Sequence, residues 1–140
     1  MADAFFDTNI LLYRLSGDAF RAGRANELLE RGGVVSVQVL NEFAAVARRK
    51  LRLNIPEIRD VLDIVRSLCD VVPLELGTHD RALDLAERYK FSIYDALIVA
   101  AAMRADCTTL WTEDLHHGQK IVPGEAAVER SHGRLVRPIR

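Results

Sequence analysis

The stretch from Ser92 to Met103 constrains the fold more than any other part of the chain. It reads Ser-Ile-Tyr-Asp-Ala-Leu-Ile-Val-Ala-Ala-Ala-Met, and from Ile93 onward apolar residues would cover every side of a helix. Such a helix is typical of a protein interior, and its alanines favour both helix formation and close packing. We therefore predict a buried helix from Ile93 to about Met103.

Asp95 is the one charged residue within this stretch. A carboxylate on an interior helix must be protonated, hydrogen-bonded, paired with a cation or bound to a metal, because an isolated ion there is costly. Ser92 and Asp95 have the Ser-x-x-Asp spacing of a capping box, which would place the acid at the positive end of the helix. Taken alone, the stretch favours this structural role; the acids elsewhere in the chain favour a functional one.

Size and composition limit the class of protein. The chain has 140 residues and a net charge of −1, and we treat residues 1–140 as one domain. No apolar run is long enough for a membrane span, and the N-terminus carries an acid where a signal peptide carries basic residues. The two cysteines, Cys69 and Cys107, are far apart and fit a reducing cytoplasm. We expect a cytoplasmic protein with no membrane partner.

Basic residues gather in two places although the net charge predicts no general attraction to nucleic acid. One group is Arg48, Arg49, Lys50 and Arg52, and the other lies in the C-terminal tail. Arg48 and Arg49 are candidate RNA contacts; the alternative for both groups is an ordinary solvated surface.

Short apolar runs alternate with amphipathic segments along the chain. This alternation predicts an α/β domain with a mainly parallel sheet. We expect strands over 4–6, 34–36, 71–74 and 106–111, with a candidate edge strand at 120–122. Helices are expected over 10–13, 20–31, 38–51, 56–68 and 78–89, followed by the buried helix that contains Asp95.

Four acids are placed to meet in such a fold. Sites in open parallel sheets form beyond the carboxyl ends of the strands, near the point where the strand order reverses. Asp7 follows the first strand, Asp114 follows the strand ending at Trp111, and Asp95 begins the buried helix. Glu42 projects from the flank of an apolar helical stripe. Each acid alone has a structural interpretation as a cap, an edge acid or a turn residue, but together they predict a cluster.

Clustered carboxylates need compensation. Two of them about 4 Å apart repel by roughly 4 kcal/mol at an effective dielectric near 20, so the cluster takes up protons or cations. Oxygen ligands suit Mg²⁺ or Mn²⁺, and a small acidic site holding such ions is suited to in-line attack on a phosphodiester.

Four segments carry a family resemblance: Phe6-Asp7-Thr8-Asn9, Val39-Leu40-Asn41-Glu42-Phe43, the run from Tyr94 to Ala102, and Leu110-Trp111-Thr112-Glu113-Asp114-Leu115. In order and spacing they resemble PIN-domain ribonucleases, most closely the VapC toxins of toxin–antitoxin modules. The resemblance implies a three-layer α/β/α sandwich, metal-dependent endoribonuclease activity, a homodimer, and inhibition by a small cognate antitoxin.

The resemblance also assigns roles by position. Asp7, Glu42, Asp95 and Asp114 would form the acidic quartet that binds Mg²⁺ or Mn²⁺, with Thr8, Asn9 and Thr112 as supporting polar residues. Glu113 adjoins Asp114 and stays open as a further ligand, although the Thr-x-Asp spacing favours Asp114.

Two other functions stay open. One is an aspartyl phosphotransferase with Asp7 as nucleophile, but the similar haloacid-dehalogenase phosphatases have Asp-x-Asp where this chain has Asn9. The other is a non-enzymatic RNA- or protein-binding module with a structural acidic cluster. Arg104, His116 and Lys120 are candidate phosphate contacts, and adjacent His116 and His117 do not form a zinc site on regular backbone.

Overall fold

A parallel β-sheet lies at the centre of the computed structural model, which describes residues 4–112 and 129–130. The strand order is β3-β2-β1-β4-β5, and every neighbouring pair is parallel. Phe5 of the central strand lies opposite Val34 on one side and Leu110 on the other. The strands are β1 (Ala4–Phe6), β2 (Gly33–Ser36), β3 (Cys69–Val72), β4 (Thr109–Thr112) and β5 (Glu129–Arg130).

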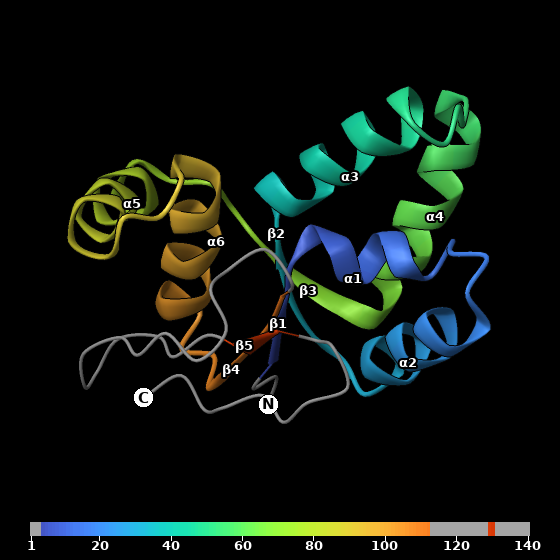
Figure 1. Ribbon diagram of the computed structural model, residues 1–140, viewed down its shortest axis with the longest axis horizontal. Helices are drawn as coiled ribbons and strands as arrows, with labels where there is room; N and C mark the ends of the chain where they lie inside the picture. Colours follow the sequence, from blue (N-terminus) through green and yellow to red (C-terminus); the bar gives the residue numbers. More distant parts are fainter. Residues whose placement is uncertain (1–3, 113–128, 131–140) are drawn as a thin grey trace.

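Helices cover both faces of this sheet (Figure 1). From β1 the chain moves outward to β2 and β3, then returns past β1 to β4. Right-handed crossovers in opposite directions place their helices on opposite faces, which gives the predicted α/β/α sandwich. The first face carries α1 (Thr8–Tyr13), α2 (Ala19–Glu30), α3 (Val37–Arg49) and α4 (Ile55–Leu68), and the second carries α5 (Leu76–Tyr89) and α6 (Ile93–Arg104).

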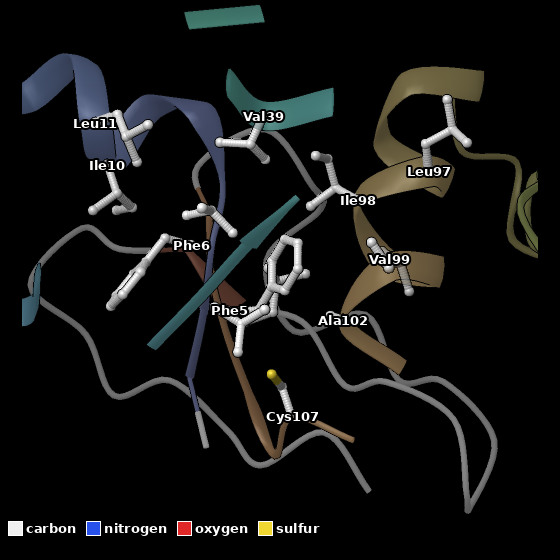
Figure 2. Close-up of a cluster of buried hydrophobic side chains, with 14 of the residues drawn as sticks. Phe5, Phe6, Ile10, Leu11, Val39, Leu97, Ile98, Val99, Ala102 and Cys107 are labelled. Carbon is white, nitrogen blue, oxygen red and sulfur yellow. The ribbon is translucent and has the colours of Figure 1, made fainter. Parts of the chain in front are cut away.

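The core lies on both faces of β1. Phe5 and Phe6 are adjacent and fully buried, and alternate residues of a strand point to opposite faces. Figure 2 shows the Phe6 ring on the side of Ile10 and the Phe5 ring on the side of Val99. Two adjacent phenylalanines therefore anchor two separate helical layers to one short strand.

The α6 helix is buried as predicted, except in its first turn. Every residue from Ala96 to Ala102 is buried, whereas Ile93 and Tyr94 are 44% and 63% exposed. The expectation of an interior position for the whole helix was wrong at this end, because packing begins only at Ala96. Asp95 is accordingly half-buried, at the margin of the core.

Several element boundaries differ from the prediction. The third strand begins two residues early, because α4 runs directly into it with Cys69 as its C-cap, and Pro73, which has no N–H to pair, lies beyond its end. The fourth strand starts at Thr109 because Asp106, at φ 55°, makes a turn after α6. The candidate strand at 120–122 lies outside the described residues, and β5 occupies the position beside β4.

The helices that the structure describes are all too short or too polar to cross a membrane.

Candidate functional site

Three helices begin at the edge of the sheet where the strands end (Figure 1). Because β1 and β2 are parallel, α1 and α3 start side by side, and these two helices are in contact. The α6 helix ends at the opposite edge of the sheet, where β4 begins, so the N-terminus of α6 also lies at the carboxyl edge. The α6 helix contacts α3 and β2. Between β1 and β4 the strand order reverses, which makes this the expected position of a site.

Asp7 lies at this reversal point and is only 3% exposed. It is the N-cap of α1: its Oδ1 accepts a hydrogen bond from the Thr8 N–H at 2.6 Å. Its Oδ2 accepts a hydrogen bond from the hydroxyl of Thr112 at the end of β4. The Asp7 N–H donates to the Trp111 carbonyl at 3.0 Å, which continues the pairing of β1 with β4 beyond the last residue of β1. The cap role is confirmed, and it holds the carboxylate in one orientation.

Glu42 reaches the same place from the second turn of α3. Its Oε2 accepts a hydrogen bond from the Thr8 hydroxyl at 2.8 Å across a separation of 34 residues in sequence. Its Oε1 accepts a hydrogen bond from Gln38 Nε2 at 3.0 Å. The half-buried position of Glu42 agrees with its predicted place beside the apolar stripe. Thr8 therefore links the two acids, with its N–H on Asp7 and its hydroxyl on Glu42.

Asp95 lies in the first turn of α6, at the same edge of the sheet. Its backbone N–H donates to the Ser92 hydroxyl at 3.2 Å, so Ser92 forms the predicted helix cap. The positive end of the helix dipole is a favourable position for an acidic side chain. The cap and a functional role for the Asp95 side chain are compatible, because the cap uses the backbone of Asp95.

The described residues contain only part of the expected acidic quartet. Asp114 lies outside them, as do Glu113, His116 and Lys120. Within residues 4–112 and 129–130, no group of three or more His, Cys, Asp or Glu side chains is arranged to hold a metal ion. Asn9, expected as a supporting polar residue, is half-buried in the first turn of α1.

The candidate RNA-contacting arginines of α3 lie away from the acids along the helix. Arg48 and Arg49 are exposed in its last turn, and a rise of 1.5 Å per residue places Arg48 about 9 Å further along the axis than Glu42. The C-terminal end of α3 also suits them electrostatically, because the helix dipole favours cations there.

Arg104 is the last residue of α6, at the end opposite Asp95. Its guanidinium pairs with Glu75 at 3.7 Å. It also lines an open pocket of about 430 Å³ with Gly77, Arg81, Asp84 and Met103. The structure therefore does not bring Arg104 together with Asp7 and Glu42.

Two further residues at this edge of the sheet were not identified from the sequence. Gln38 orients Glu42, and the signal was its i, i+4 spacing on one helix. Ser36 ends β2 and caps α3 by accepting the Val39 N–H at 3.2 Å. A serine directly between an apolar strand and an amphipathic helix is a typical N-cap signal.

The donor atoms gathered around Asp7 are suited to a hard cation. They are carboxylate oxygens of Asp7 and Glu42 and hydroxyl oxygens of Thr8 and Thr112. Mg²⁺ and Mn²⁺ prefer such oxygen ligands, whereas zinc and copper prefer nitrogen and sulfur. The two cysteines lie in the hydrophobic core. The residues present fit a magnesium or manganese site to which further ligands are added.

Fold and site together define an α/β/α domain with linked carboxylates at the reversal point of a parallel sheet. The family model for the PIN domain matches residues 4–120, and the chain belongs to the PIN-domain family. Comparison with curated proteins finds no match.

Solved structures of VapC proteins share this fold. A toxin–antitoxin complex from Klebsiella pneumoniae has a TM-score of 0.63 and 26% identity, covering 89% of this chain and 94% of that one. VapBC2 from Rickettsia felis, bound to a DNA fragment from its promoter, has a TM-score of 0.63 and 22% identity, covering 91% and 97%. Mycobacterium tuberculosis VapC20, described as a sarcin–ricin loop cleaving toxin, has a TM-score of 0.63 and 18% identity, covering 76% and 86%. The fold is therefore VapC-like.

Proposed function

We propose that the protein is an endoribonuclease that hydrolyses RNA phosphodiester bonds with the help of Mg²⁺ or Mn²⁺. The observation that carries this proposal is the link between Asp7 and Glu42 through Thr8, with Thr112 on the second oxygen of Asp7. Two acids far apart in sequence are brought together where a parallel sheet forms its sites. The PIN-domain match and the similarity to an RNA-cleaving VapC toxin support the choice of RNA as substrate.

Asp7, Glu42, Asp95 and Asp114 are the residues that would hold the cation. When bound, it supplies Lewis-acid stabilisation for the negative charge that develops on the phosphate during hydrolysis. Because Asp7 and Glu42 already accept hydrogen bonds from neighbouring residues, their oxygens are held in position before a ligand arrives. Mutation of such hydrogen-bond partners commonly lowers metal affinity or activity by about 10- to 100-fold.

The remaining hydrogen bonds have a positioning role in this proposal. Thr112, fully buried at the end of β4, fixes Asp7, and Gln38 fixes Glu42. Asp95, at a helix N-terminus, contributes a carboxylate from the opposite helical layer. Asp7 caps α1, Glu42 lies on α3 and Asp95 lies on α6, so the three acids come from three helices that begin at one edge of the sheet.

The two other functions have less support. A phosphotransferase with Asp7 as nucleophile needs a second acid at the position of Asn9, and the family match points elsewhere. A purely binding module would not require several acids at the reversal point of the sheet.

We further propose that the enzyme is the toxin of a toxin–antitoxin pair, forms a homodimer and is inhibited by a small cognate antitoxin. The similar structures from Klebsiella pneumoniae and Rickettsia felis are toxin–antitoxin or VapBC complexes, which supports this assignment. Induced expression should arrest growth of a bacterial host. Co-expression of the cognate antitoxin, which we expect to be encoded by a small reading frame beside the toxin gene, should restore growth. Growth without arrest would contradict the toxin assignment.

The test of the activity is cleavage of labelled RNA by the purified protein. Cleavage is expected with Mg²⁺ or Mn²⁺ and should stop in excess chelator. Asp95→Asn should abolish cleavage with little change in melting temperature, because Ser92 caps α6 through the backbone of residue 95.

Asp63→Asn is the matched control, because Asp63 is an exposed acid on α4. It should cleave as the parent does. Cleavage that persists in excess chelator would refute the metal-dependent mechanism. A lower melting temperature of Asp95→Asn with unchanged cleavage would show that this acid is purely structural.

A further inference from the structure

Arg24 of α2 lies over the ring of Trp111, with its guanidinium carbon 5.5 Å from the ring centroid. Its Nε is buried and has no hydrogen-bond partner within residues 4–112 and 129–130. No carboxylate within the described residues pairs with it. A buried polar nitrogen without a partner is uncommon in folded proteins. Because Nε itself is buried, the acceptor of a ligand would meet the terminal nitrogens of the Arg24 guanidinium.

Two more arginines extend this feature along α1 and α2. Arg21 is three residues before Arg24 on the same helix, so the two side chains are neighbours on its surface. The Arg21 guanidinium lies 5.1 Å from the centroid of the Tyr13 ring and pairs with Asp18 at 3.8 Å. Arg14 follows Tyr13, and its Nη1 is also buried without a hydrogen-bond partner among the residues that the structure describes. We name Arg14, Arg21 and Arg24 the arginine patch.

The arginine patch carries more positive charge than its paired carboxylates offset. Asp18 is the one carboxylate that pairs with it in the part of the chain that the structure describes. Guanidinium groups form two parallel hydrogen bonds to phosphate, and they stay charged in proteins. Proteins that bind single-stranded nucleic acid use positively charged surfaces that follow the phosphate backbone, with aromatic side chains nearby.

Trp111 connects the arginine patch to the acids. Its ring lies under Arg24, and its carbonyl accepts the hydrogen bond from the Asp7 N–H. The next residue, Thr112, donates to the Asp7 carboxylate. Two consecutive residues at the end of β4 therefore contact both features: Trp111 lies against Arg24, and Thr112 holds the Asp7 carboxylate.

We propose that the arginine patch binds backbone phosphates of the RNA strand that is cut at the acids. This inference rests on the proposed ribonuclease function and adds to it a binding surface on α1 and α2. The patch positions the RNA and does not touch the bond that breaks. Its loss should therefore weaken RNA binding and raise KM, while kcat changes little.

The test is the affinity of Arg14→Gln and Arg24→Gln for a short fluorescent single-stranded RNA of mixed sequence, measured in excess chelator so that the RNA stays intact. Each variant should bind about tenfold more weakly, as expected for the loss of one charge-assisted hydrogen bond. The slope of log K against log salt should become shallower by about 0.7 between about 50 and 200 mM salt, because one phosphate contact is lost. Arg24→Lys, which keeps the charge, should retain most of that salt dependence.

Arg88→Gln is the matched control, because Arg88 also lies over an aromatic ring, 5.4 Å from the Tyr89 centroid, but on α5 at the opposite face. It should bind RNA as the parent does. Unchanged affinity and salt slope in both patch variants, with RNA cleavage by the parent intact, would overturn this inference and leave the proposed function standing. A parent that neither binds nor cleaves RNA would overturn both. Loss of affinity for a polyglutamate peptide, with RNA affinity unchanged, would identify a protein-docking surface and also refute the proposal.

Discussion

At the scale of single residues, Thr8 has the most specific role in the site. Its N–H holds Asp7, and its hydroxyl holds Glu42 at 2.8 Å. Thr8→Val keeps the backbone bond and the shape of the side chain but removes the hydroxyl. We expect kcat to fall by about 10- to 100-fold, the usual range for loss of a group that orients a metal ligand.

Thr8→Ser is the control for this prediction, because it restores the hydroxyl. It should recover most of the activity in the same RNA cleavage assay. If Thr8→Val cleaves RNA at the parental rate, the link between the two acids has no part in catalysis.

Cys69 gives a prediction about alkaline pH. Burial, with a smaller contribution from the neighbouring charge of Asp70, raises the pKa of the Cys69 thiol to about 11 from its ordinary value of 9.0. The folded state thus favours the protonated thiol more than the unfolded state does. The resulting stability is present below pH 9 and is lost as the pH rises toward 11, because the unfolded chain then releases the proton first.

The measurement is the free energy of unfolding in urea as a function of pH, for the parent and for Cys69→Ala. The parent should lose more stability than the variant between pH 9 and 11. Parallel pH profiles would show that the thiol contributes nothing to this decline.

At the scale of elements, Gly33 fixes how β2 packs against β1. A Cβ at this position would lie 2.5 Å from Cε2 of Phe6 and 2.7 Å from the carbonyl oxygen of Ala4. Neither group is free to move, because Phe6 is fully buried and Ala4 belongs to the central strand. Gly33→Ala should therefore destabilise the protein by about 1–3 kcal/mol, as overpacking of a core does.

Gly23 in the middle of α2 is the matched control, because a Cβ there meets no atom within 4 Å. Gly23→Ala should stabilise the protein by about 0.5–1 kcal/mol, since alanine is the better helix former. Chemical denaturation measures both changes. A Gly33→Ala variant as stable as the parent would contradict the packing described here.

The elements were predictable where local chemistry determines them. The apolar run of α6 and the cap at Ser92 are local signals, and the structure confirms both. The third strand was placed two residues late, because Cys69 and Asp70 carry no strand signal of their own. Their pairing with Gly33 and Val34 of β2 defines the strand, and that contact is not local.

At the scale of the whole molecule, the order of the strands brings the site together. The sequence predicted which acids follow strands and which begin helices. It could not predict that Thr8 joins Asp7 to Glu42, because that bond depends on how α1 packs against α3. The arginine patch was missed for the same reason: α2 meets Trp111 only in the folded chain.

The central claim is that distant acids meet at the carboxyl edge of the sheet and hold a divalent cation. The most direct test is a calorimetric titration of the parent protein, Asp7→Asn and Asp95→Asn with Mn²⁺. We expect saturable binding to the parent and strongly weakened binding to both variants, while the control Asp63→Asn binds as the parent does. A parent protein that takes up no Mn²⁺, or variants that bind it with parental affinity, would contradict the claim.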